Sequence, residues 1–88
     1  MNVRYFAAAR AAAGVEEERF DLPSGATVAD LLTAVLMVER PSPPAGTPPL
    51  PRILSRSSFL LNEVAIRDRD TVLNPGDVVD VLPPFAGG

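Results

Sequence analysis

The sequence LNPGDVVDVLPPFAGG, residues 73–88, contains a turn, a strand and a tail in direct succession. In Asn74–Asp77, proline at the second position and glycine at the third favour a type II turn. The run Val78–Leu82 is strongly β-branched and predicts a central strand of a sheet. Pro83 and Pro84 then hold the backbone extended, so residues 83–88 are expected to leave the body as a stiff protruding tail.

The tail ends in Gly87 and Gly88, which lack a Cβ and are therefore slim and conformationally permissive. That shape suits the delivery of a terminal carboxylate into a narrow channel of another protein. Glycines at a chain end are often simply frayed, but the order Pro-Pro-x-x-Gly-Gly directly after an apolar strand favours a functional tail. Phe85 is too near the end to join the core and is expected to anchor in a partner's channel.

Two strands are predicted near the N-terminus. Val3–Ala7 and the alternating residues Arg19–Leu22 are expected to form an antiparallel hairpin. The alanine-rich Ala8–Gly14 between them predicts a turn or a single helical turn.

The main helix is predicted to follow Gly25. Thr27 is a suitable N-cap, and Asp30 three residues later completes a capping-box-like pair. The helix is expected to end near Val38 or Glu39, because Pro41 follows. Its apolar face follows helical spacing and consists of Val28, Leu31, Leu32 and Val35.

Six of the ten prolines lie in Pro41–Pro51, which predicts a surface loop. A polyproline ligand for an SH3-type groove is the alternative, but the segment carries no charge to orient such binding. Arg52–Ser57 predicts one turn of helix. Phe59–Leu61 and Val64–Ile66 predict short strands joined by a turn.

Together these elements predict one α+β domain over residues 1–88, in which one main helix packs on one face of a mixed sheet. A single helix covers only one face of a sheet. The other face is therefore expected to meet water or a partner.

The composition argues against a self-sufficient catalyst. The 88 residues carry a net charge of −3, no lysine and only scattered arginines, so the cationic face that nucleic-acid binding requires is missing. Without cysteine or histidine the chain has no thiolate, no imidazole base and no usual zinc ligand, and no metal site is predicted. No stretch is apolar enough to span a bilayer and no signal-peptide pattern is present, so we expect a cytoplasmic location and no membrane partner.

Three stretches carry a family resemblance: VRYFAAAR at residues 3–10, LNE at residues 61–63, and the G-D-x-V and P-P-x-x-G-G patterns within residues 73–88. In these the chain resembles the small sulfur-carrier proteins, most closely the molybdopterin synthase small-subunit family. The resemblance implies a ubiquitin-like β-grasp fold with an extended Gly-Gly tail. The Pro41–Pro51 loop and Pro75 depart from the family's pattern.

The resemblance implies a non-catalytic carrier that acts as a co-substrate within an enzyme complex. An ATP-dependent activating enzyme would adenylate the terminal carboxylate of Gly88, and sulfur from a donor protein would convert it to a thiocarboxylate (1-thioglycine). The large molybdopterin synthase subunit would then transfer this sulfur to precursor Z, the cyclic pyranopterin monophosphate, within a heterotetramer. The carrier itself would bind no cofactor.

The resemblance also assigns residues to partner binding. Phe6, Ala65 and Leu82 match positions that face a partner, although Phe6 and Leu82 are equally consistent with core positions. The tail residues Pro83, Pro84, Phe85 and Ala86 complete this set, and Gly87 and Gly88 form the reactive end.

Three other functions stay open at this point. A carrier for thiazole or cysteine biosynthesis also ends in Gly-Gly, although Pro83-Pro84 is more typical of the molybdopterin branch. A ubiquitin-like modifier conjugated through Gly88 begins with the same acyl-adenylate. A plain interaction domain with an inert tail needs no chemistry at all.

Overall fold

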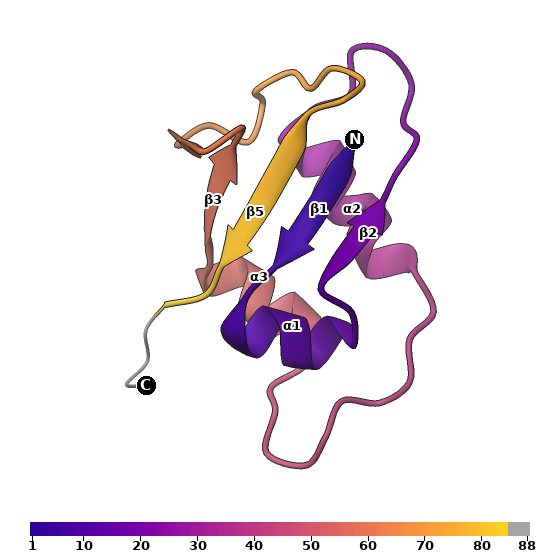
Figure 1. Cartoon of the computed structure of the whole chain (residues 1–88), viewed down its shortest axis with the longest axis vertical. Helices are drawn as coiled ribbons and strands as arrows, with labels where there is room; N and C mark the ends of the chain where they lie inside the picture. The colour runs from indigo at the N-terminus through magenta and orange to yellow at the C-terminus, as the bar shows by residue number, and fades with distance from the viewer. Residues whose placement is uncertain (85–88) are drawn as a thin grey trace.

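A computed structural model describes residues 1–84, which form a five-stranded mixed sheet and three helices (Figure 1). The sheet order is β2-β1-β5-β3-β4; β1 and β5 pair in parallel, and the other neighbours pair antiparallel. The predicted α+β class and mixed sheet are confirmed. The strands are β1 (Asn2–Tyr5), β2 (Glu17–Arg19), β3 (Ser58–Leu61), β4 (Val64–Ile66) and β5 (Val78–Leu82), and the helices are α1 (Ala7–Ala13), α2 (Val28–Met37) and α3 (Leu50–Arg56).

β5 is the central strand, as its β-branched sequence predicts. It lies between β1 and β3, and its Val79 and Val81 side chains are fully buried. The turn before it is also as predicted. Gly76 has a φ of +89°, which favours glycine, and the Asp77 amide donates to the Asn74 carbonyl at 3.1 Å.

α2 begins with the predicted capping box. The Asp30 amide donates to the Thr27 hydroxyl at 3.2 Å, and the Thr27 amide donates to the Asp30 carboxylate at 2.9 Å. The helix ends at Met37, close to the predicted end, because Val38 adopts an extended backbone. The predicted apolar face is the buried one and contains Val28, Leu31, Leu32 and Val35.

The predicted main helix is α2, and two shorter helices accompany it where at most one helical turn each was predicted. The alanine run forms a seven-residue α1, about two turns, where a turn or a single helical turn was expected. Ala9, Ala12 and Ala13 are buried, and α1 contacts α3. This tertiary packing stabilises a helix too short to persist alone. Gly14, with a φ of +82°, ends it.

α3 shortens the predicted Pro41–Pro51 loop, which ends at Pro49. Pro51 lies in the first turn of α3, where its missing N–H would have no helical partner in any case. Leu50, Ile53 and Leu54 are buried, so α3 begins where the chain first returns to the core.

β2 occupies Glu17–Arg19 instead of the predicted Arg19–Leu22. The antiparallel pairing with β1 is confirmed, but α1 connects the two strands. Pairing with β1 determines the position of β2. Asn2 lies opposite Arg19, and the Phe20 amide donates a hydrogen bond to the Met1 carbonyl. Phe20 itself is half-buried against the core beyond the strand.

The predicted turn between β3 and β4 is formed by Asn62 and Glu63, whose φ values are +50° and +70°. Asparagine tolerates this left-handed backbone better than most residues. Its side chain also bonds the start of β5: the Asn62 Oδ1 accepts from the Val78 amide, and the Nδ2 donates to Asp77.

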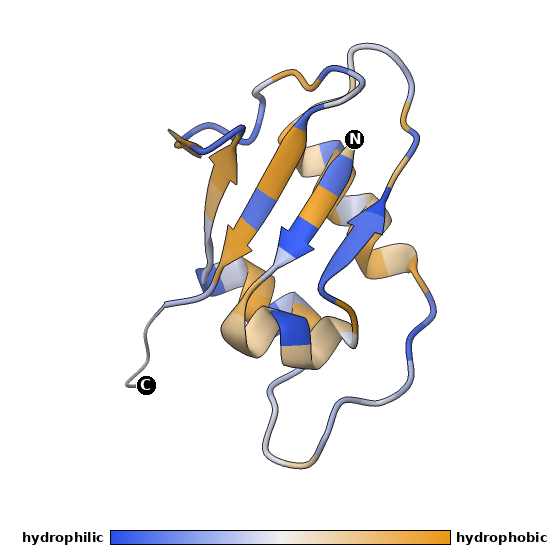
Figure 2. Ribbon diagram, viewed as in Figure 1, coloured by the Kyte–Doolittle hydropathy of each residue, from blue (hydrophilic) through white to orange (hydrophobic). Residues whose placement is uncertain are grey.

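The helices and the sheet form two layers. α2 and α3 lie behind the sheet in Figure 1, and α1 lies beyond the ends of β1 and β5. The core fills the space between these layers, and β5 is apolar over most of its length (Figure 2). No helix of residues 1–84 crosses the opposite side, which we term the open face. Its central side chains are Arg4, Phe6, Leu60, Ala65, Asp80 and Leu82.

Candidate functional site

β5 runs directly into the predicted tail. Leu82 and Pro83 are half-buried at the end of the strand, and Pro84 is exposed. Pro84 is the last described residue, so the predictions for Phe85, Ala86, Gly87 and Gly88 lie outside the described part of the chain. Because β5 is fixed by two neighbouring strands, the position and direction of the tail's origin are fixed as well.

The three residues assigned to partner binding lie on the open face. Ala65 is opposite Leu60, Leu60 is opposite Asp80, and Leu82 follows two residues later on the same face. Phe6 is 40% exposed, Leu82 is half-buried and Ala65 is exposed. Phe6 and Leu82 are therefore not core residues, and the three side chains are available on one surface beside the tail. Their role in binding stays a prediction.

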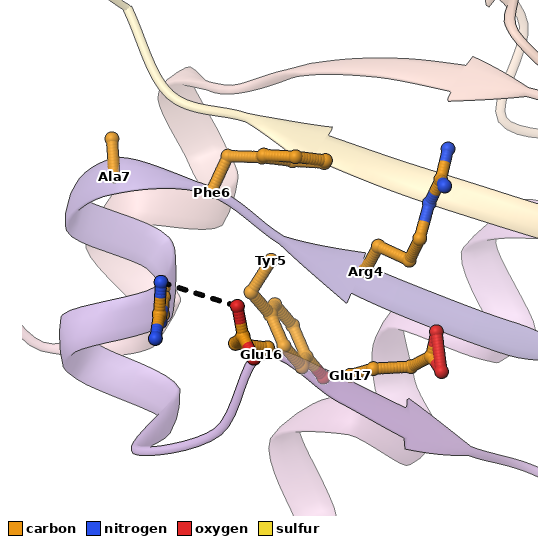
Figure 3. A pocket seen from close by; sticks show the side chains of 7 residues that line it. Arg4, Tyr5, Phe6, Ala7, Glu16 and Glu17 are labelled. Atoms are coloured by element: carbon orange, nitrogen blue, oxygen red, sulfur yellow. Dashed lines mark ion pairs between the residues drawn. The ribbon is translucent and has the colours of Figure 1, made fainter.

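An ion pair occupies the centre of this face. Asp80 is 4% exposed, and Arg4 donates to it through Nε at 2.5 Å and Nη2 at 2.7 Å. The Arg4 guanidinium also lies 6.0 Å from the centre of the Phe6 ring, on the same side of β1 (Figure 3). Sequence reasoning missed this pair. The available signal was Asp80, a single carboxylate within an apolar strand, which requires a cationic neighbour.

A shallow hollow borders Phe6 where β1 passes into α1 (Figure 3). Arg10 of α1 and Glu16, just before β2, form an ion pair of 3.2 Å in it. Both side chains are largely exposed, so the pair contributes little to stability. The hollow extends the open face from Phe6 toward β2.

On the helix side, a groove lies against the start of the tail. We term it the tail-root groove; it is lined by Ala8, Pro48, Arg52, Ile53, Arg56, Pro83 and Pro84. Its walls therefore come from α1, the proline-rich loop, α3 and the tail itself. Sequence reasoning missed this groove, because its walls are far apart in the chain.

A second, partly buried ion pair joins the layers. Arg40 donates to both carboxylate oxygens of Glu18 at 2.6 and 2.8 Å, and the Tyr5 hydroxyl donates to Glu18 at 2.7 Å. Arg40 also donates to the carbonyls of Ala13 and Val35 near the ends of α1 and α2. The cluster faces away from the open face, and we interpret it as structural.

The ionisation of this cluster follows from its contacts. Burial by itself would raise the pKa of Glu18, but hydrogen bonds from Arg40 and Tyr5 outweigh it and lower that pKa. Burial and the hydrogen bond to Glu18 raise the pKa of the Tyr5 hydroxyl. At neutral pH the cluster therefore contains a carboxylate, a guanidinium and a neutral phenol.

Nowhere in residues 1–84 do three or more carboxylate, imidazole or thiol side chains gather as a metal site would require. None of the helices described there has the length and apolar character to span a membrane.

A family model described as the ThiS family matches residues 3–88. The chain belongs to the ThiS family. The match includes β1, the open face and the whole of the tail.

This ThiS-family chain is 36% identical, over 89 aligned positions, to the molybdopterin synthase sulfur carrier subunit of Chlamydomonas reinhardtii. The alignment covers 100% of this chain and 98% of the relative. The two proteins therefore match from end to end.

Solved structures show the same fold. SAMP1 from Haloferax volcanii superposes with a TM-score of 0.76 at 25% identity, covering 99% of this chain and 97% of that one. Subunit 1 and subunit 2 of the molybdopterin-converting factor from Helicobacter pylori were solved as a complex; the match there has a TM-score of 0.63 at 25% identity and covers 99% and 96%. The predicted ubiquitin-like β-grasp fold is confirmed for this ThiS-family member, with the shorter helices α1 and α3 beside the main helix α2.

Proposed function

We propose that this chain is the small, sulfur-carrying subunit of a molybdopterin synthase. The observation that carries the proposal is the end-to-end identity of 36% with a molybdopterin synthase sulfur carrier subunit. The Pro83-Pro84 and Gly87-Gly88 pairs in this sequence provide the arm and the slim end that such a carrier requires.

The reactive group in this proposal is the carboxylate of Gly88. A carboxylate is ionised at neutral pH and is a poor electrophile. ATP in an activating enzyme converts it to an acyl-adenylate and releases pyrophosphate. Sulfide, or a donor-protein persulfide whose S–S bond a thiol then cleaves, displaces AMP at the acyl carbon and leaves a thiocarboxylate. In the large subunit this sulfur bonds to precursor Z, and water cleaves the acyl C–S bond and restores the carboxylate of Gly88. With no cysteine in the sequence, this chain has no thiol of its own on which to store sulfur.

The open face is the proposed docking surface for the large subunit. The Helicobacter pylori subunit 1, which this chain resembles, is found in complex with subunit 2. The Phe6 ring and the half-buried Leu82 lie on the open face, and Leu82 directly precedes Pro83 at the start of the tail. A partner that covers them also receives the tail, so docking and delivery occur together.

The test is the intact mass of the protein, purified without a C-terminal tag from cells that contain its activating enzyme and sulfur donor. We expect a species heavier by the exchange of one oxygen for one sulfur, absent from a variant that lacks Gly88. Sulfur can be added only if Gly88 carries a free carboxylate, and the intact mass also shows whether it does.

Two results contradict the proposal. Finding only the unmodified acid with the activating enzyme and donor present removes the sulfur-carrier role. Recovery of the chain attached to lysines of other proteins, with no thiocarboxylate, identifies a modifier instead. We also propose a cytoplasmic location, and fractionation of the native cells checks it.

A further inference from the structure

The tail-root groove has apolar walls and a cationic rim. Ala8, Pro48, Pro83 and Pro84 line it together with Ile53, which is 6% exposed. Arg52 and Arg56 stand one helical turn apart on α3, and both are exposed at the groove. The groove has a volume of about 380 Å³, enough for one or two side chains of another protein.

The two rim arginines differ from most others in the chain. Within residues 1–84, the arginines of the N-terminal half each form an ion pair with a carboxylate, whereas Arg52 and Arg56 form none. The uncharged proline-rich segment precedes them, and Glu63 is the next acidic residue in the sequence. In a chain with a net charge of −3, this groove is a local cationic site. The paired arginines are Arg4, Arg10, Arg19 and Arg40.

We propose that the tail-root groove is a second docking surface, on the helix side of the tail, that binds an acidic segment of the large subunit. An apolar side chain of this segment fits against Pro48 and Ile53, and neighbouring carboxylates meet Arg52 and Arg56. This inference rests on the proposed function, because it states how the large subunit that receives the tail binds Pro83 and Pro84 at the start of that tail.

The position of the groove favours the large subunit as its binding partner. Pro83 and Pro84 are both part of the groove wall and the first residues of the tail. A protein that encloses the tail as far back as Pro83 and Pro84 therefore contacts the groove wall as well. The open face orients the carrier from one side of β5, and a contact at the groove fixes the tail from the other, so the tail is held on both sides.

The charge of the rim determines the chemistry of the segment. Two uncompensated guanidinium groups favour carboxylates and disfavour cations when they are brought against another surface. Because both arginines stay partly in water, their effect is expected in the association rate and its salt dependence more than in the dissociation rate.

The experiment measures association of the full-length chain with the purified large subunit by surface plasmon resonance at two ionic strengths. The Arg52→Glu/Arg56→Glu variant is expected to associate about tenfold more slowly at low salt, with a smaller difference at high salt. Arg52→Lys/Arg56→Lys keeps the charge and is expected to associate nearly as fast as the wild type.

The matched control is Arg67→Glu/Arg69→Glu. It makes the same change in net charge with arginines that form no ion pair within residues 1–84 and do not line the groove. Thermal melting of every variant shows that the fold is intact. We expect the control to associate much faster than Arg52→Glu/Arg56→Glu.

The outcomes separate the two proposals. If Arg52→Glu/Arg56→Glu and the control slow association equally, the effect is net charge and the groove proposal is overturned while the proposed function stands. If Arg52→Glu/Arg56→Glu associates with the large subunit as fast as the wild type does, the assignment of the groove to the large subunit is wrong. If the wild type fails to bind the large subunit at all, the proposed function fails and this inference fails with it.

Discussion

Arg4 and Asp80 join the first strand to the last across the open face, through two hydrogen bonds between residues 76 positions apart in the chain. The Asp80 carboxylate is almost completely buried, and the Arg4 side chain is 39% exposed. A buried carboxylate is strongly unfavourable without a partner. The pair therefore favours the observed register of β1 against β5 and places a polar group among the apolar side chains of Phe6, Leu60 and Leu82 on the open face.

Removing the arginine is expected to destabilise the protein more than removing the aspartate. Arg4→Leu leaves Asp80 buried without its cation and is expected to lower Tm by more than about 5 °C. Asp80→Ala leaves an arginine that water already reaches, so its effect is smaller. The double variant is expected to lie closer to the wild type than Arg4→Leu does. Thermal unfolding followed by circular dichroism measures all three, and equal, additive effects of the single variants would contradict the prediction.

Phe6 is expected to contribute more to large-subunit binding than to folding. Because its ring is 40% exposed, Phe6→Ala should lower Tm less than the loss of a buried ring such as Phe59 would. Loss of an aromatic contact at the centre of an interface raises Kd by roughly 10- to 30-fold. Calorimetric titration with the large subunit measures this. The control is Met37→Ala on the helix layer, at an even more exposed side chain; a similar loss of affinity in both variants argues against docking through the open face.

Acid should weaken the cluster of Tyr5, Glu18 and Arg40 that joins the sheet to the helices, because it protonates Glu18. The folded state lowers the pKa of Glu18, so the unfolded state binds the proton more readily. The contribution of Glu18 to stability is therefore complete above its unfolded pKa of about 4.3 and is lost as pH falls through the lower folded value. Urea unfolding at pH 7 and at acidic pH measures the loss. Glu18→Gln should show a smaller decrease; an identical decrease would show that other carboxylates cause it.

Alkali should act on the same cluster through Tyr5. The folded state raises the pKa of the Tyr5 hydroxyl, so ionisation favours the unfolded chain. The contribution is present below the unfolded pKa of about 10 and decreases as pH rises above it. Tyr5→Phe removes the hydroxyl and should be less stable than the wild type at neutral pH by about 1 kcal/mol. The difference between the two proteins should narrow above pH 10, as denaturant unfolding at both pH values can show.

The capping box should contribute to α2 by a predictable amount. Thr27→Ala removes the hydroxyl that accepts from the Asp30 amide and is expected to lower the free energy of unfolding by about 1 kcal/mol. Thr33→Ala is the matched control, since Thr33 is exposed in the middle of the same helix. Denaturant unfolding measures both. A loss in the control as large as that in Thr27→Ala would rule out the cap as the cause.

Local sequence signals correctly predicted the elements that depend on neighbouring residues. The Thr27–Asp30 cap, the Asn74–Asp77 turn and the β-branched β5 are each determined within a few positions. α1 and α3 were underestimated because burial against each other extends them beyond their local propensity. β2 was placed too late because its position depends on pairing with β1.

The site was predicted where a family pattern was available and missed where distant residues meet. Phe6, Ala65 and Leu82 were identified by resemblance, and the structure places them on one face. The Arg4–Asp80 pair and the tail-root groove were missed, since each joins segments from opposite ends of the chain. A sequence shows that Asp80 needs a cation but not which of eight arginines supplies it.

The position of β5 between two hydrogen-bonded neighbours also has a mechanical consequence. A pull on the tail acts along β5, across its inter-strand hydrogen bonds, which are perpendicular to the strand toward antiparallel β3 and slanted toward parallel β1. Such a pull loads these hydrogen bonds together in shear, so they do not break one after another from the end of the strand. Tension on Pro83 and Pro84 is therefore borne by the whole length of β5, so the sheet resists unravelling when a partner pulls on this end of the strand.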